Sequence, residues 1–208
     1  IEGLKSEEKN ASAIASKVSN ALMYGKNTSR GEFETVETIG KIQLADVQNI
    51  YKKYYAPDNA YLVIVGDVKF DKVKPMIEKA FSGWKKANTP LTPVEPASNV
   101  ATTEINVVDV PTAVQSVVSV NNINNLKMKD PNYFPATIAN YVLGGGGEAR
   151  LFMNLREKNG FTYGAYSNLS ASKYSPQFSA SASVRNEVTD KAVKEFMNEL
   201  NGISTVKP

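Results

Sequence analysis

The sequence predicts an α+β fold of two layers, with helices packed on mainly antiparallel sheets. Several segments repeat apolar residues at the spacing of an α-helix, and residues 178–184 alternate apolar and serine side chains with the period of a strand. The chain lacks the regular succession of strand and helix that a doubly wound parallel sheet requires. With 208 residues, of which 42% are hydrophobic, it is long enough for one large domain or two small ones.

The first part of the chain, residues 1–86, is expected to mix helices with a strand. Asn10 can cap a helix because its side-chain oxygen can accept a backbone N–H of the first turn. Pro57 stops a later helix because proline disfavours helical backbone in the residue before it. The continuous apolar run at residues 61–65 predicts a strand that is buried on both faces. The expected order is a helix over 10–25, a helix over 44–55, the strand over 61–65 and a helix ending at Gly83.

The second part, residues 100–208, is likewise expected to mix helices with strands. Asp130 is expected to cap a helix that has Pro131 in its first turn, and Thr189 to cap the last helix. The predicted strands lie over 103–109, 113–120, 161–166 and 178–184, the last two paired through the turn at 173–176. The stripe expected to bury the helix after Asp130 consists of Phe134, Ile138, Tyr141 and Val142.

A proline-rich segment separates these two parts. Residues 87–99 carry Pro90, Pro93 and Pro96 among Thr, Ser and Asn and show no periodicity, which is typical of an extended linker. The predicted division is therefore 1–86, the linker over 87–99, and 100–208.

Two residue types are absent, and their absence excludes several functions. Without cysteine the chain forms no disulfide, and without histidine it has no Ser-His-Asp triad and no imidazole base. Catalytic zinc sites normally use imidazole ligands, so this chain cannot complete one. The net charge of +3, from 24 basic and 21 acidic residues, is too balanced for a nucleic-acid-binding protein. No apolar run approaches the ~20 residues that cross a bilayer.

Four consecutive glycines, at residues 144–147, mark a mobile loop or one that another group approaches closely. Within it, Gly145 and Gly146 are candidates for contact with a ligand. A phosphate-binding loop is not indicated, because no strand precedes the glycines and no Lys-Ser or Lys-Thr follows them.

A helix–turn–strand unit follows the glycines and carries two candidate binding residues. Asn159 and Gly160 both tolerate the left-handed backbone that ends helices, so a short amphipathic helix is expected to stop there. Arg156 lies near the end of this helix and Tyr163 lies in the strand beyond the turn. A guanidinium and a phenol are both hydrogen-bond donors, which suits an extended polar ligand.

Two stretches resemble the M16 family of zinc metallopeptidases, which includes pitrilysin, insulin-degrading enzyme and the mitochondrial processing peptidases. One is residues 54–67, YYAPDNAYLVIVGD, similar to a helix-to-strand junction of that family. The other runs from Val114-Gln115-Ser116 through Leu143-Gly-Gly, Arg150-Leu-Phe and Leu155-Arg-Glu to Gly160 and Tyr163. The resemblance covers nearly the whole chain in the family's order. It implies the processing-peptidase-like fold, in which two similar α+β halves joined by a linker face each other around a chamber.

The resemblance assigns this chain to the later part of a first half, the linker and the early part of a second half. Because the halves are similar, the two parts could instead associate as one permuted domain. The resemblance implies that Arg156 and Tyr163 hydrogen-bond the carbonyl side of a peptide substrate, with Gln115 as a further candidate facing the chamber. It also implies that the catalytic zinc and its His-x-x-Glu-His motif lie outside this chain. Glu2 falls near the position of a further glutamate ligand.

The predicted function is that of a non-catalytic, substrate-binding part of a zinc endopeptidase that acts on peptides. The expected partners are an extended peptide and a zinc-bearing peptidase half or subunit, in a homo- or heterodimer, and the expected location is a bacterial periplasm or envelope. The alternative is a structural subunit that supports a catalytic partner. Apart from the resemblance, the structural alternative for each residue is that Arg156 pairs with nearby carboxylates or helix-end carbonyls, that Tyr163 is a core aromatic, and that Gln115 bonds backbone within a sheet.

Overall fold

The computed structural model describes residues 1–90, 93–94 and 97–205 and divides into two compact units. One unit combines Ile1–Val36 with Val94–Pro208, and the other is Glu37–Pro93. Residues 91–92 and 95–96 of the predicted linker lie outside the described residues. The predicted division at the linker, and its alternative of one permuted domain, remain predictions about the protein as a whole.

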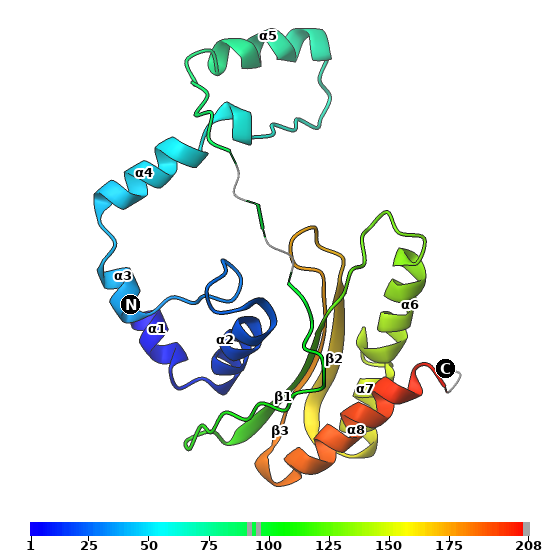
Figure 1. Ribbon diagram of the computed structural model, residues 1–208. Helices are drawn as coiled ribbons and strands as arrows, with labels where there is room; N and C mark the ends of the chain where they lie inside the picture. Colours follow the sequence, from blue (N-terminus) through cyan, green and yellow to red (C-terminus); the bar gives the residue numbers. More distant parts are fainter. Residues whose placement is uncertain (91–92, 95–96, 206–208) are drawn as a thin grey trace. The chain divides into compact units, whose positions relative to one another are not determined.

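The larger unit is built on a three-stranded antiparallel sheet, in agreement with the predicted α+β class (Figure 1). Its central strand pairs on one side with the first strand and on the other with the second, so the order is β1–β3–β2. The predicted pairing of the last two strands is confirmed, with Ala165 opposite Ala182 and Leu169 opposite Phe178. The strands are β1 (Gln115–Ile123), β2 (Thr162–Ser170) and β3 (Gln177–Arg185).

Helices lie on both faces of this sheet (Figure 1). On one face lie α6 (Tyr133–Gly144), α7 (Arg150–Phe152), the π-helical η2 (Met153–Lys158), the 3-10 turn η3 (Asn186–Val188) and α8 (Thr189–Gly202). On the other face lies α2 (Ala11–Tyr24), preceded by α1 (Glu2–Glu7). As predicted, the Asn10 side chain accepts the N–H groups of Ser12 and Ala13, and Gly25 ends α2 at φ +82°.

The core lies between the sheet and the layer of α6, α7 and α8. The alternation predicted for residues 178–184 is confirmed, because Ala180, Ala182 and Val184 are buried in this core. The intervening serines point to the opposite face, where with α2 they line a cavity of about 430 Å³. The largest fully buried side chains are Phe196, Leu151, Leu155 and Val184.

Two predicted helix starts are wrong. The Asp130 carboxylate accepts the N–H of Lys127 at 2.7 Å and so closes a turn, and α6 begins only at Tyr133. Thr189 is the first residue of α8 rather than its cap, and its hydroxyl lies 2.8 Å from the Ser116 hydroxyl and 2.9 Å from a carbonyl of η3. In both cases a nearby turn or strand supplies a better hydrogen-bond partner than the helix end does.

Most of the stripe predicted to bury α6 faces solvent instead, and only Val142 of its four residues is half-buried. Phe134, Ile138 and Tyr141 are 71%, 66% and 68% exposed. The face turned to the sheet contains Leu143, which is buried, and Asn140, whose Oδ1 accepts the hydroxyl of a serine in β2 at 2.9 Å. This helix is therefore apolar on both faces, and its periodicity alone could not show which face is buried.

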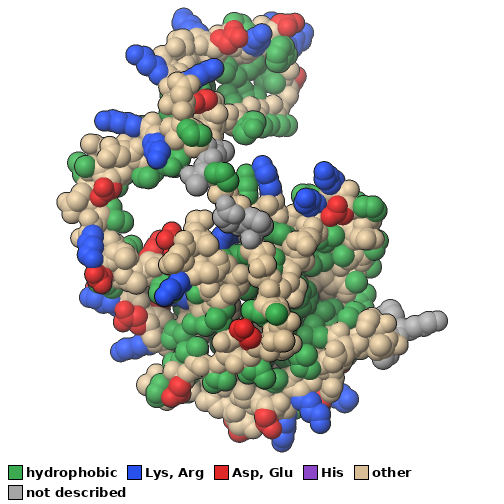
Figure 2. All heavy atoms as spheres, viewed as in Figure 1, with side chains coloured by type: hydrophobic (Ala, Val, Ile, Leu, Met, Phe, Trp, Pro, Cys, Tyr) green, Lys and Arg blue, Asp and Glu red, His purple; other side chains and the backbone are tan. Residues whose placement is uncertain are grey.

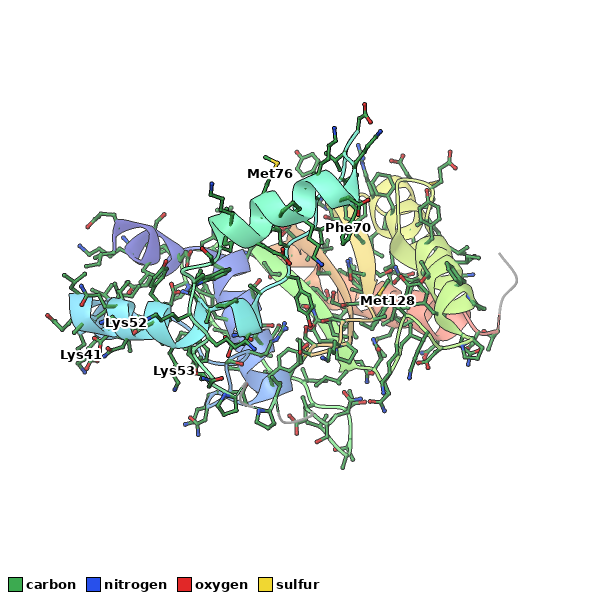
Figure 3. All side chains as sticks on the ribbon, turned by 90° about the horizontal axis from the view of Figure 1, so that it is seen from above. Lys41, Lys52, Lys53, Phe70, Met76 and Met128 are labelled. Atoms are coloured by element: carbon green, nitrogen blue, oxygen red, sulfur yellow. The ribbon has the colours of Figure 1, made fainter. Side chains whose placement is uncertain are left out.

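The smaller unit contains helices joined by extended backbone. Its elements are α3 (Val36–Gly40), α4 (Leu44–Tyr54), η1 (Pro57–Asn59) and α5 (Phe70–Ala80). The predicted stop of α4 before Pro57 is confirmed. Phe70 and Met76 project from α5 and are 74% and 69% exposed (Figure 3). Basic residues, Lys and Arg together, and acidic residues are scattered over the displayed face of the molecule rather than gathered in one patch (Figure 2).

Two predicted strands do not form among the described residues. Residues 61–65 are extended but have no strand beside them, and Tyr61 and Val65 are 100% and 92% exposed. Residues 103–109 are likewise unpaired, with Ile105 and Val107 88% and 87% exposed. A strand is stable only when its backbone groups find partners, and the described part of the chain offers none to these two segments.

Candidate functional site

The segment after α7 winds more widely than an α-helix. In η2 the N–H of Asn159 reaches the carbonyl of Asn154, five residues earlier, at 3.1 Å. Gly160 then takes the left-handed conformation at φ +61°, and the next N–H bonds the Leu155 carbonyl at 2.9 Å. The predicted helix end is thus confirmed, although Asn159 keeps a negative φ of −105°.

A buried polar network ties this segment to α8. Asn154 is 9% exposed, and its Nδ2 donates to Glu195 at 2.9 Å and to Glu199 at 2.6 Å. Arg150 Nε donates to the other oxygen of Glu199 at 2.8 Å. From the opposite side, Asn159 Nδ2 donates to the Asn154 carbonyl at 3.0 Å and to its Oδ1 at 2.6 Å. Bonds to charged groups are stronger than neutral ones, so the network holds the π turn against α8.

Arg156 leaves this segment on its solvent side. Its guanidinium lies 4.8 Å from the centre of the Phe152 ring, and its Nε lies 3.5 Å from a carboxylate oxygen of Glu157. The side chain of Arg156 is 46% exposed. A stacked cation is worth about 0.5–1 kcal/mol at such a site, and an exposed ion pair about as little. The guanidinium is therefore oriented by the ring while nearly half of the side chain faces solvent.

Tyr163 lies in a β-bulge. Thr162 is opposite Val184 and Ala165 is opposite Ala182, so β2 has one residue more than β3 between these pairs. The Thr162 hydroxyl donates to the Ser183 carbonyl at 2.6 Å and accepts the N–H of the bulge at 3.1 Å. Tyr163 is 86% exposed and is therefore not a core aromatic.

Phe152 connects the helical segment with the strand. Besides Arg156, it contacts Tyr166 of β2, with the two ring centres 5.8 Å apart. The Tyr166 ring lies so close to Gly164 that a Cβ on that glycine would fall 2.6 Å from it. Sequence reasoning did not identify Phe152 or Tyr166. The four-residue spacing from Phe152 to Arg156 is the signal that could have found the first of them.

Arg185 closes the turn between η2 and β2. Its Nη1 donates to the Gly160 carbonyl at 2.7 Å, and its Nε donates to Glu187 at 2.7 Å. A hydrogen bond from the backbone N–H of Glu187, followed by the bond from Arg185, lowers the pKa of this carboxyl. Gln115 begins β1 opposite Arg185. Since β3 lies between β1 and β2, the backbones of Gln115 and Thr162 are about 10 Å apart, two strand spacings.

Two positions of the glycine run, Gly144 and Gly145, leave no room for a Cβ, and only Gly145 was a predicted site residue. A Cβ at Gly144 would lie 2.4 Å from the backbone nitrogen of Ser167 in β2, so this glycine lets α6 approach the sheet. Gly145 ends α6 and donates its N–H to the Tyr141 carbonyl at 3.0 Å. A Cβ at Gly146 would meet nothing closer than 3.7 Å. The assignment of Gly145 and Gly146 to a ligand stays a prediction.

The described residues do not fit a zinc site. Among them, no three His, Cys, Asp or Glu side chains gather closely enough to hold a metal ion. Glu2, the candidate ligand, lies on the exposed α1 and pairs with Lys5 Nζ at 2.9 Å. No helix in the described part of the chain is both long and apolar enough to span a bilayer.

These features define an α+β domain with an open sheet edge and no metal centre in its described residues. The sequence matches the Peptidase M16 inactive domain over residues 41–205. The chain therefore belongs to the M16 peptidase family, as its resemblance predicted, and corresponds to the part of it that is described as inactive.

Relatives support this assignment. An uncharacterized zinc protease of Streptomyces coelicolor is 28% identical over 187 residues, which are 88% of this chain and 40% of that protein. The peptidase M16 inactive domain from Pseudomonas fluorescens has a TM-score of 0.80 at 21% identity, covering 100% of this chain and 50% of that one. The periplasmic protease PqqL from Escherichia coli has a TM-score of 0.71 at 17% identity, covering 96% and 22%. These structures are similar in fold, and the chain spans half or less of each relative.

Proposed function

We propose that this chain is the non-catalytic, substrate-binding part of an M16 zinc endopeptidase and that it binds an extended peptide along the outer edge of β2. One observation carries the proposal. Among the described residues β2 pairs with β3 alone, so its other edge presents unpaired N–H and C=O groups. An extended peptide can bind such an edge as an additional strand, because its own backbone supplies the matching groups.

Arg156 and Tyr163 are suited to the carbonyl side of that peptide. Arg156 is stacked on Phe152 with nearly half of its side chain exposed, and Tyr163 projects from the bulge at the start of β2. A guanidinium and a phenol are both donors, and donors stabilise a carbonyl oxygen that becomes negative during peptide-bond cleavage. The role of Arg156 and Tyr163 is therefore to bind and orient the substrate.

In this proposal the metal chemistry comes from outside the chain. The Streptomyces relative is described as a zinc protease, and the present chain covers 40% of its length. The zinc ion and its glutamate base would belong to a half or subunit that carries a His-x-x-Glu-His motif, and zinc would activate the attacking water there. The purified chain alone is expected to bind extended peptides weakly and to cleave none. Zinc-dependent cleavage by the purified chain would contradict the non-catalytic assignment.

The test uses the complex of this chain with the zinc-bearing partner. Arg156→Ala and Tyr163→Phe should each lower kcat/KM for peptide cleavage by about a hundredfold, the usual effect of removing a donor to a developing oxyanion. Lys191→Ala and Tyr174→Phe are matched controls, since Lys191 is exposed on α8 and Tyr174 is 48% exposed in the turn before β3. Unchanged cleavage in both site variants would exclude the substrate-binding role.

The exposed stripe of α6 favours a second candidate function, that of a scaffold for the catalytic partner. Phe134, Ile138 and Tyr141 are each about two-thirds exposed or more, and a helix that is apolar all round is normally covered. If this surface holds the partner, Phe134→Ser with Ile138→Ser should weaken association while Arg156→Ala leaves cleavage unchanged. Analytical ultracentrifugation with the partner distinguishes the two functions.

A further inference from the structure

We infer that Asn159 and Thr162 are positioning residues that aim Arg156 and Tyr163 at the peptide, an inference that rests on the proposed function. Each of the two peptide-facing residues lies where the backbone contains one residue more than a regular element would. Arg156 lies in the π turn of η2, and Tyr163 lies in the bulge of β2. Such insertions are less stable than regular helix or sheet, so specific side-chain contacts must hold them.

Asn159 holds the π turn from the position directly after its last residue. Its backbone N–H makes the five-residue hydrogen bond to Asn154, and its Nδ2 adds bonds to the same carbonyl and to the Asn154 side chain. Glu195 and Glu199 fix Asn154 in turn from α8. The side chain of Asn159 therefore reinforces a five-residue backbone bond of the kind that distinguishes this turn from an α-helix.

Loss of the Asn159 side-chain hydrogen bonds should redirect Arg156. If the segment relaxes to four-residue hydrogen bonds, its two ends rotate relative to each other by about 100°, the turn of one helical residue. The stacking of Arg156 on Phe152, at 4.8 Å, depends on the present geometry. Asn159 itself needs no contact with the peptide for this effect.

Thr162 has the same role for the bulge. Its hydroxyl bridges the two strands, donating to the Ser183 carbonyl at 2.6 Å and accepting the Gly164 N–H at 3.1 Å. The second bond satisfies an N–H that the extra residue removes from the ladder. Without the hydroxyl, β2 is expected to regain regular pairing, and a slip of one residue turns a side chain to the other face of a sheet.

The experiment measures affinity of the whole chain for an unstructured, fluorescein-labelled peptide by fluorescence anisotropy. Asn159→Ala should weaken binding about tenfold, because the guanidinium loses its bond to the peptide. Combined with Arg156→Ala, it should cause no further loss, whereas combined with Tyr163→Phe the two losses should add. Asn159→Asp, which keeps the size but loses the donor, provides a second variant if the alanine variant does not fold.

Thr162 is tested with the same set of single and double variants. Thr162→Val should act through Tyr163 and be additive with Arg156→Ala, and Thr162→Ser, which keeps the hydroxyl, should bind like the unmodified chain. Asn198→Ala is the matched control for Asn159→Ala. Like Asn154, Asn198 donates to Glu195, at 3.2 Å, but it lies on the exposed side of α8. If Asn159 and Thr162 had only a structural role, their variants would lower the melting temperature. Asn159→Ala would then not be additive with Tyr163→Phe alone, nor Thr162→Val with Arg156→Ala alone.

The outcomes separate the inference from the proposed function. If Arg156→Ala and Tyr163→Phe leave peptide binding unchanged, the proposed function fails and the inference fails with it. If both weaken binding but Asn159→Ala and Thr162→Val do not, or if all combinations add, the positioning roles are overturned and the proposed function stands.

Discussion

Two segments with the composition of a strand behave differently in this molecule. Residues 61–65, Tyr-Leu-Val-Ile-Val, are the more apolar and β-branched of the two, yet they are extended, unpaired and largely exposed. Strand β3, which is rich in alanine and serine, lies at the centre of the sheet with a neighbour on each side. Intrinsic strand preference would have ranked them in the opposite order.

The difference shows that partners decide which segment becomes a strand. The alternation in β3 needs one covered face, and α8, α7 and α6 supply it through a core centred on Phe196 and Leu151. The run over 61–65 is apolar at every position and so needs neighbours on both edges and cover on both faces. The smaller unit, described from residues 37 to 90 and at 93, contains helices but no strand.

Hydrogen exchange of the backbone amides gives the sharpest test of this comparison. Amides of residues 180–184 should exchange at least about a thousandfold more slowly than those of residues 62–65, after correction for sequence, because the former open only with the core. Residues 105–107, equally unpaired, provide an internal control and should behave like 62–65. Comparable protection in the two segments would mean that residues 61–65 have found a strand partner in solution.

The parts of the fold that could be predicted are those set by local chemistry. The cap at Asn10, the stops at Gly25 and Pro57, and the alternation around Ala182 depend on neighbouring residues and were read correctly. The burial of α6 could not be read, because the choice between its two apolar faces depends on Gly144 fitting against Ser167, far away in the sequence.

In the candidate site, too, local features could be predicted from the sequence and features that depend on distant contacts could not. Arg156 and Tyr163 were identified from their helix–turn–strand unit and given a role by the family resemblance, and the structure shows both partly or largely exposed near one sheet edge. The π turn and the bulge that carry them could not be predicted, because each depends on contacts with another element. Those contacts are Asn154 with α8 in one case and Thr162 with Ser183 in the other.

The glycine run allows the close packing of the larger unit to be tested with a matched pair. Gly144→Ala should destabilise the chain by about 1–3 kcal/mol, since its Cβ would lie 2.4 Å from the backbone of Ser167 and α6 would have to move. Gly146→Ala places its Cβ at ordinary contact distance, 3.7 Å from the nearest atom, and should change stability by less than about 0.5 kcal/mol. Urea unfolding followed by circular dichroism measures both. Equal effects would show that α6 does not pack tightly on β2.

The smaller unit should respond to acid through one carboxylate. Asp58 accepts the N–H groups of Ala87 at 3.1 Å and of Asn88 at 2.8 Å, and the bond from Ala87 is the largest cause that lowers the pKa of Asp58 below 3.8. A lowered pKa means that the folded unit favours the ionised form. This contribution to stability is therefore complete above the unfolded pKa and is lost as the pH falls through the lower folded value.

Trp84, the single tryptophan, reports whether the bonds from Ala87 and Asn88 to Asp58 are intact. Its Nε1–H donates to the Tyr55 carbonyl at 3.2 Å, and Tyr55 and Trp84 lie close in sequence to Asp58 and Ala87 respectively. Its fluorescence should shift to longer wavelength only below about pH 4, where an aspartate begins to take up protons. In Asp58→Asn the shift should be present already at neutral pH, because an uncharged acceptor binds the two N–H groups more weakly. Glu78→Gln, which removes a carboxylate of α5 lying 3.8 Å from Lys74, should retain the acid transition. An Asp58→Asn spectrum that matches the unmodified chain from neutral to acidic pH would show that the two backbone bonds do not hold this unit closed.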